Sequence, residues 1–105
     1  AHFYFDQNSL ETARAIYENA KALESTKLGT FHERSVGPHV KWSFMILFYE
    51  ENYKEILSWV KISHSNLSVL IHPDTGDDYK DHTENALWIG DKVELNLDSF
   101  LKGKT

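Results

Sequence analysis

Four stretches of the chain have the alternation or the apolar density expected of β-strands. Phe3 and Phe5 alternate with His2 and Tyr4, so the two pairs point to opposite sides of an extended chain. A strongly apolar stretch near the middle of the chain is expected to be a central strand. We predict strands at His2–Asp6, Lys27–Val36, Lys41–Tyr49 and Leu67–Ile71.

Two other stretches repeat their apolar residues with helical spacing. The first has an apolar stripe from Leu10 to about Ser25, and Asn8 with Glu11 forms a capping-box-like start. The second helix follows Glu50 and buries a stripe made of Tyr53, Ile56, Leu57 and Val60. We expect Thr83–Ile89 to be a short helix or a packed tail, and Leu97–Thr105 to be a loosely held extension.

The order strand-helix-strand-strand-helix-strand predicts an α+β protein with a ferredoxin-like βαββαβ fold. In this fold two helices cover one face of an antiparallel sheet with spatial strand order 4-1-3-2, and here a C-terminal loop or short helix follows. The length of 105 residues fits a single domain. Because the third strand is apolar on both sides, the second sheet face should be covered by a pocket or by a homodimer interface.

Composition narrows the classes of function. The net charge of −5 and the absence of a Lys/Arg cluster argue against a nucleic-acid partner. There is no cysteine, which excludes disulfides, thiolate metal sites and a cysteine nucleophile. No apolar run is long enough to span a membrane, and we expect a cytoplasmic protein.

The polar loop after the fourth predicted strand is the richest in chemical groups. Between His72 and His82 it holds four aspartates, and Pro73 and Gly76 make it turn. Since the first and fourth strands of this fold are antiparallel neighbours, His2 at the start of one should lie beside His72 at the end of the other. If Phe3 faces the helices, His2 faces the open side of the sheet, where His72 can join it.

Three further histidines are weaker candidates. His32 lies on the second strand, about 10 Å from the first, and the small Ser43 can sit between them. His39 needs a bent loop or a second subunit to reach the other histidines, and His82 can fold back from the tail. Each has an ordinary alternative, because a single histidine at a strand end is more often a surface or capping residue than a ligand.

Several of these segments together resemble one known family. They are Ala1-His2-Phe3-Tyr4-Phe5-Asp6, Gly29-Thr30-Phe31-His32-Glu33-Arg34-Ser35-Val36-Gly37-Pro38-His39, His72-Pro73-Asp74-Thr75-Gly76-Asp77, Asp81-His82 and Ala86-Leu87-Trp88-Ile89-Gly90. In this order they resemble the DOPA 4,5-dioxygenase family of small aromatic ring-cleaving enzymes. The family's first motif usually reads His-Ala-His, and the numbered chain starts at the alanine of that motif.

The resemblance implies a ferredoxin-like fold and an extradiol dioxygenase that opens a catechol such as L-DOPA with non-haem Fe(II) and O2. It makes His2, His72 and His32 the metal-ligand candidates, because Fe(II) sites of this kind use neutral imidazoles. The acid–base candidates are His82 and His39. The substrate-binding candidates are Arg34, which can hold a carboxylate, together with Trp42 and Tyr4.

Two alternatives remain open at this stage. One is a non-catalytic dimeric ferredoxin-like domain that binds a small aromatic ligand or a metal. The other is a closed zinc site held by histidines, which would leave no position for substrate. Zinc in isolated protein would not decide between these functions, because zinc binds nitrogen ligands more tightly than Fe(II) does.

Overall fold

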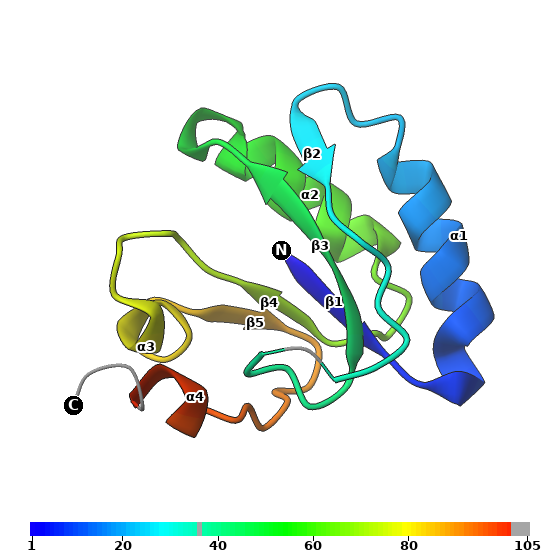
Figure 1. Ribbon diagram of the computed structural model, residues 1–105. Coiled ribbons are helices and arrows are strands. Elements are labelled where there is room, and N and C mark those ends of the chain that lie inside the picture. Colours follow the sequence, from blue (N-terminus) through cyan, green and yellow to red (C-terminus); the bar gives the residue numbers. More distant parts are fainter. Residues whose placement is uncertain (36, 102–105) are drawn as a thin grey trace.

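The structure is a computed structural model that describes residues 1–35 and 37–101. Within these residues five antiparallel strands form one sheet in the spatial order β2-β3-β1-β4-β5 (Figure 1). The strands are β1 (His2–Phe5), β2 (Thr26–Leu28), β3 (Trp42–Phe48), β4 (Val69–Ile71) and β5 (Leu87–Ile89). The helices are α1 (Leu10–Ala20), α2 (Tyr53–Ser63), α3 (Asp78–Asp81) and α4 (Asp98–Leu101), and the 3₁₀ turns are η1 (Gln7–Ser9) and η2 (Glu50–Asn52).

The predicted α+β fold and the strand order 4-1-3-2 are confirmed, with β5 added beside β4. The short helix considered for Thr83–Ile89 is wrong, because Leu87–Ile89 forms a strand that pairs with the exposed edge of β4. Trp88 of this segment does pack, as the alternative of a packed tail predicts, against Tyr4. The predicted second strand is shorter than expected. Regular pairing ends at Leu28, and only a single bridge joins His32 to Ser43 further along.

Aromatic rings dominate the core between the sheet and the helices α1 and α2. Phe44 on β3 is 1% exposed, and its ring stacks on Phe3 with 4.8 Å between centroids. Phe31 stacks on the same ring of Phe44, although it lies in the loop after β2. Because Phe3 and Phe5 both enter this core, the intervening Tyr4 points to the opposite face. The predicted alternation, with Phe3 and Phe5 on one side of the strand and Tyr4 on the other, is confirmed.

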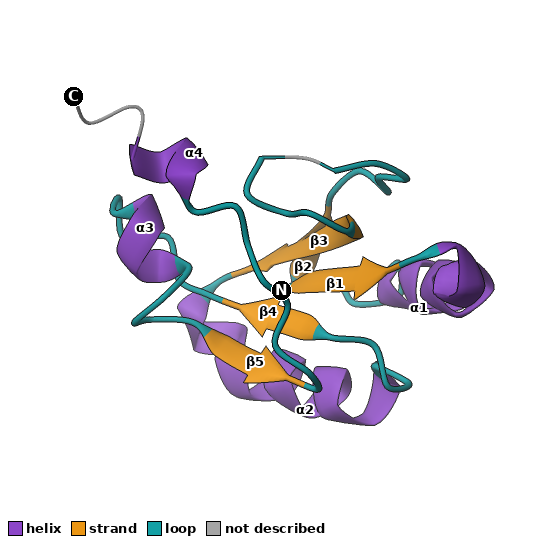
Figure 2. Ribbon diagram, turned by 90° about the horizontal axis from the view of Figure 1, so that it is seen from below, coloured by secondary structure: helices purple, strands orange, loops and turns teal. Residues whose placement is uncertain are grey.

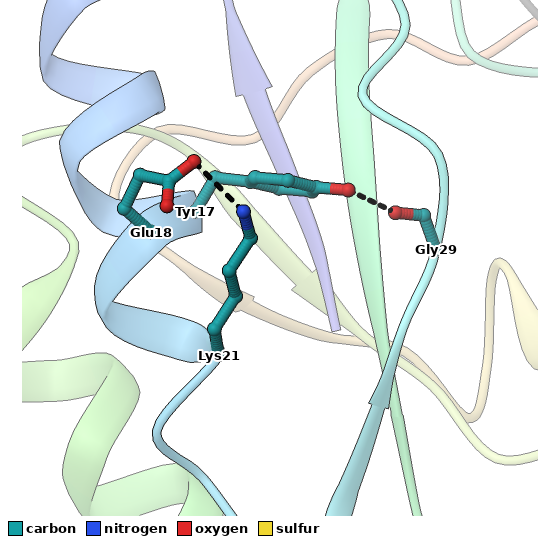
Figure 3. Close-up of polar contacts among 4 residues, drawn as sticks. All are labelled: Tyr17, Glu18, Lys21 and Gly29. Atoms are coloured by element: carbon teal, nitrogen blue, oxygen red, sulfur yellow. Dashed lines mark hydrogen bonds and ion pairs between the residues drawn. The ribbon is translucent and has the colours of Figure 1, made fainter.

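Helix α1 is fastened to the segment that follows β2. The hydroxyl of Tyr17 donates to the carbonyl of Gly29 at 2.8 Å, across the end of the sheet (Figure 3). The Tyr17 ring also meets Phe44 edge-on. At the C-terminal end of α1, Glu18 and Lys21 form an exposed ion pair at 3.0 Å, which adds little stability.

The second face of the sheet is partly covered by the chain itself. Tyr4, Leu70 and Val93 form a separate buried cluster there, and Val93 comes from the segment 91–97 after β5. Figure 2 shows α2 on one side of the sheet and the segment that leads to α4 on the other. On β3 and just beyond it, Leu47 and Tyr49 stay 52% and 75% exposed. The predicted homodimer is not tested by this arrangement and stays a prediction.

Two sequence-based expectations concern the termini and the membrane. Among the described residues no helix has the length and apolarity needed to cross a bilayer. The expected extension Leu97–Thr105 begins with a turn and α4, and its last four residues, 102–105, lie outside the described part of the chain.

Candidate metal centre

Four imidazole rings gather on the sheet face opposite α1 and α2. They belong to His2, His39, His72 and His82. The Nε2 atoms of His2 and His72 are 2.9 Å apart, and the rings of His72 and His82 have centroids 4.0 Å apart. One ligand nitrogen from each of His2, His39 and His82 lies within 4.8 Å of the others. The rings therefore converge on one small volume.

Strand geometry brings His2 and His72 together. His2 is the first residue of β1 and pairs with Leu70 on the antiparallel β4. His72 lies two residues after Leu70, directly after the end of β4. It is therefore the diagonal neighbour of His2 on the same face. The proximity of these two histidines, predicted from the topology, is confirmed by the 2.9 Å contact.

Two loops supply the other rings. His82 follows directly after α3 and is 9% exposed. His39 follows the turn that contains Gly37, whose φ of +58° suits glycine, and it is 8% exposed. The loop bends far enough for His39 to contact His2 within one chain, at 4.3 Å between centroids. No second subunit is needed for this contact.

Backbone carbonyls fix the protonation pattern of two rings. Nδ1 of His72 lies 2.8 Å from the carbonyl oxygen of Pro73, and Nδ1 of His82 lies 2.7 Å from that of Asp78. A carbonyl oxygen can only accept, so each Nδ1 must carry the proton and donate it. The lone pairs of His72 and His82 are then on Nε2, which is the usual arrangement for a histidine that binds a metal.

Three of the four rings, those of His2, His39 and His72, are held in an environment that favours neutral imidazole. Burial, followed by the positive charges of the N-terminus and of the neighbouring imidazoles, lowers the pKa of His2 well below its ordinary value. Burial also lowers the pKa of His39 to about 4 and lowers that of His72. Neutral rings have the lone pairs that a metal needs. Two nitrogens bound at about 2.1 Å and at right angles to each other would be about 3.0 Å apart, so the His2–His72 spacing fits a shared metal ion.

Asp81 holds the loop that carries His72 and His82. Its carboxylate is 1% exposed and accepts from the Thr75 backbone N–H at 2.8 Å and from the Thr75 hydroxyl at 2.7 Å. Asn85 adds a third hydrogen bond at 3.2 Å. Burial alone would raise the pKa of Asp81, but the hydrogen bonds lower it below its ordinary value. The sequence marks this residue only as one of four loop aspartates and does not reveal that it is buried.

Tyr4, a predicted substrate-binding residue, lies on the histidine face and is hydrogen-bonded to one of the four rings. Its hydroxyl lies 2.6 Å from Nδ1 of His39, and its side chain is buried against Leu70 and Trp88. Burial raises the pKa of Tyr4 well above its ordinary value, so the phenol stays protonated. The alternation of β1 places Tyr4 on the face of His2, but nothing in the sequence shows the hydrogen bond to His39.

Three other sequence-based candidates lie outside the cluster of four imidazoles. His32 faces the same side as His2, but Ser43 lies between the second strand and β1, as predicted. Trp42 packs against Phe5 in the core under the helices, on the opposite face from the histidines. Arg34 is exposed in the loop after His32. The positions of His32, Trp42 and Arg34 leave their proposed roles untested.

An open cleft of about 640 Å³ lies near the other end of β1. It is bordered by Phe5 and Asp6 from the strand end, by Lys41, and by the segments 65–68 and 91–94. The four imidazoles are not among the residues that line it, although Tyr4 is. The cleft is therefore separate from the histidine cluster.

Comparison with known proteins agrees with this geometry. The sequence profile of the Dopa 4,5-dioxygenase family matches residues 1–99. An uncharacterised 21.2 kDa protein of Botryotinia fuckeliana and a DOPA 4,5-dioxygenase of Amanita muscaria are each 30% identical over 91% of this chain. The chain spans 57% and 46% of the lengths of these two relatives. A crystal structure of a candidate dioxygenase from Nostoc punctiforme is 31% identical, covers 99% of this chain and 90% of its own, and superposes with a TM-score of 0.91.

Proposed function

Because the chain belongs to the Dopa 4,5-dioxygenase family, we propose that it is an extradiol dioxygenase that cleaves the ring of a catechol such as L-DOPA, with non-haem Fe(II) and O2. The observation that carries this proposal is the cluster of four imidazoles on one sheet face, three of which, His2, His39 and His72, have lowered pKa values. The family membership supports this chemistry, and the cluster offers imidazole nitrogens of the kind that bind Fe(II).

We assign the metal to His2, His72 and His82. The rings of His72 and His82 direct unprotonated Nε2 atoms inward, and Nε2 of His2 is 2.9 Å from that of His72. This set replaces His32, proposed from the sequence, by His82, because His82 is in contact with His72 and His32 lies beyond Ser43. Bound Fe(II) would supply coordination positions for the catechol oxygens and for O2.

His39 has the position of an acid–base group in this site. It is buried, contacts His2, and lies 5.9 Å from His82 between ring centroids. An imidazole there can donate a hydrogen bond or a proton to an oxygen of the bound catechol. The role of His39 is thus retained from the sequence-based assignment, whereas that of His82 changes.

The proposal is tested by reconstituting the metal-free protein with Fe(II) without oxygen and then adding L-DOPA and O2. Stoichiometric oxygen uptake with a yellow product is the expected result. Absence of uptake with L-DOPA, caffeate and catechol would sink the enzyme proposal and favour a domain that binds an aromatic ligand or a metal without turnover.

Ligand variants test the assignment of the metal. His72→Ala should abolish binding of Fe(II), while His64→Gln, at the end of α2 and bonded to the carbonyl of Leu67, should leave it unchanged. Normal iron binding by the His72 variant would remove His72 from the ligand set. Zinc serves as a second probe of the same site, because it binds nitrogen ligands without redox chemistry.

A further inference from the structure

We propose that Tyr4 is a positioning residue that holds the proton of His39 on Nε2, so that His39 offers the site an N–H group and not a lone pair. The effect of this hydrogen bond on catalysis rests on the proposed dioxygenase function, whereas the tautomer of His39 does not. Its structural part concerns one hydrogen bond, the 2.6 Å contact between the Tyr4 hydroxyl and Nδ1 of His39.

The direction of this hydrogen bond follows from the burial of Tyr4. The residue is 2% exposed, and within the described part of the chain Nδ1 of His39 is the one hydrogen-bond partner of its hydroxyl. If Nδ1 of His39 carried the proton and donated it to Tyr4, the phenolic proton would be left buried without an acceptor, which is unfavourable. The phenol must therefore donate, and the proton of a neutral His39 must be on Nε2.

His39 differs in this respect from two of its neighbours. In His72 and His82 the partner of Nδ1 is a carbonyl oxygen, which can only accept, whereas in His39 the partner is a hydroxyl, which can donate. The same type of side chain is thus held in opposite tautomers by different partners. His72 and His82 direct lone pairs inward, and His39 directs a proton.

The Tyr4 hydroxyl is held rigidly. Its ring packs on Trp88 at 5.7 Å between centroids, and its backbone is paired with Ser43 on β3. The N–H of Tyr4 also donates to the carbonyl of Ser68 on the other side of β1. The buried phenol cannot turn away from His39 without losing its packing on Trp88 and Leu70.

The consequence for the site is a division of roles among four similar rings. With His39 held as a donor, three imidazoles remain for the metal, and coordination positions stay free for substrate. The Nε2–H of His39 can then donate to an oxygen of the bound catechol. If His39 were free to change tautomer, it could compete for the metal as a fourth ligand and close the site.

The test reads the tautomers directly in metal-free, ¹⁵N-labelled protein from two-bond correlations between ring protons and nitrogens. We expect His39 with the proton on Nε2, and His72 and His82 with it on Nδ1. In Tyr4→Phe the ring and its packing remain, and we expect the Nε2–H form of His39 to lose its dominance while the other two rings are unchanged. Tyr17→Phe removes a comparable hydroxyl elsewhere and should leave all three rings as they were.

Two outcomes would overturn the proposal. One is wild-type His39 with its proton on Nδ1, a result that does not depend on whether the phenylalanine variant folds. The other is an unchanged His39 tautomer in folded Tyr4→Phe. On the Fe(II)-loaded protein we expect Tyr4→Phe to lower kcat about 10- to 100-fold, the range of other groups that orient site residues, with little change in KM.

Failure of the proposed function gives a different pattern. If no catechol is turned over but the tautomers are as stated, the dioxygenase assignment falls and the Tyr4–His39 hydrogen bond stands. If turnover is found but His39 has its proton on Nδ1, the enzyme assignment stands and the role given to Tyr4 is wrong.

Discussion

His2 and His72 are separated by 70 positions in the chain, yet their Nε2 atoms lie 2.9 Å apart. The contact exists because β1 and β4 are antiparallel neighbours and both residues project to the face that the helices do not cover. Because His72 has its proton on Nδ1, the Nε2–H of a neutral His2 can donate to the Nε2 lone pair of His72, whereas two imidazolium ions would repel. The fold therefore places a pH-sensitive contact at the start of its central strand.

Metal-free protein should lose stability as the pH falls from about 6.5 towards 4. The folded pKa values of His2, His39 and His72 are lowered, that of His39 to about 4, so below pH 6.5 the unfolded chain binds more protons than the folded chain. Each such histidine would contribute a slope of up to about 1.4 kcal/mol per pH unit. Urea denaturation between pH 7.5 and 4 measures this, and His39→Gln should reduce the slope. A flat profile would contradict the prediction.

Asp81→Asn should destabilise the protein by about 1–3 kcal/mol, because an amide NH2 would face donors where an oxygen now accepts. The variant should also weaken metal binding, since the loop between His72 and His82 depends on this carboxylate. Asp74→Asn is the matched control, because it changes the net charge equally at an exposed position and should stay within about 0.5 kcal/mol of the wild type. Equal effects of the two changes on urea denaturation would show that Asp81 does not organise the loop.

Gly90→Ala should cost stability through both backbone strain and a clash. Gly90 has φ of +79°, and an added Cβ would lie 2.9 Å from the carbonyl oxygen of Leu67. We expect the free energy of unfolding to fall by about 1–3 kcal/mol from backbone strain, and further because of the clash. Gly37→Ala separates the two causes, because Gly37 also has a positive φ, +58°, but no atom lies within 4 Å of its added Cβ. A Gly90 variant no less stable than the Gly37 variant would rule out the clash.

Arg34→Gln tests whether the exposed loop after His32 binds the substrate carboxylate. For L-DOPA we expect KM to rise about 10- to 100-fold, the worth of one hydrogen bond to a charged group. Catechol itself, which has no carboxylate, should be turned over with unchanged KM. A parallel change for both compounds would mean that Arg34 acts on the structure of the loop and not on the carboxylate.

The fold could be predicted largely from the sequence because its signals are local and periodic. The alternation of Phe3 with His2 and Tyr4 is enough to separate the core face from the histidine face, and the topology then brings His72 beside His2. The strand Leu87–Ile89 is not predictable from the sequence, because a three-residue strand has almost no periodicity. It forms because its backbone can pair with the otherwise free edge of β4.

The site was only partly predictable. The bend that returns His39 to the cluster depends on the conformation of a loop, and the hydrogen bonds of Tyr4 and Asp81 depend on side-chain orientations. None of these has a short sequence signature. Trp42 was predicted to line the site from its closeness in sequence to His39, but strand alternation sends its side chain to the other face of the sheet.

The central position of β1 has a consequence for how the protein is made. β1 is synthesised before the other strands, yet its neighbours in the sheet are β3 and β4, which end at Phe48 and Ile71. During synthesis, β1 can therefore pair with both of its neighbouring strands only after about two thirds of the chain has left the ribosome. The nascent chain has no preformed histidine cluster, so the four rings can come together only after translation has passed β4 and the loop to His82.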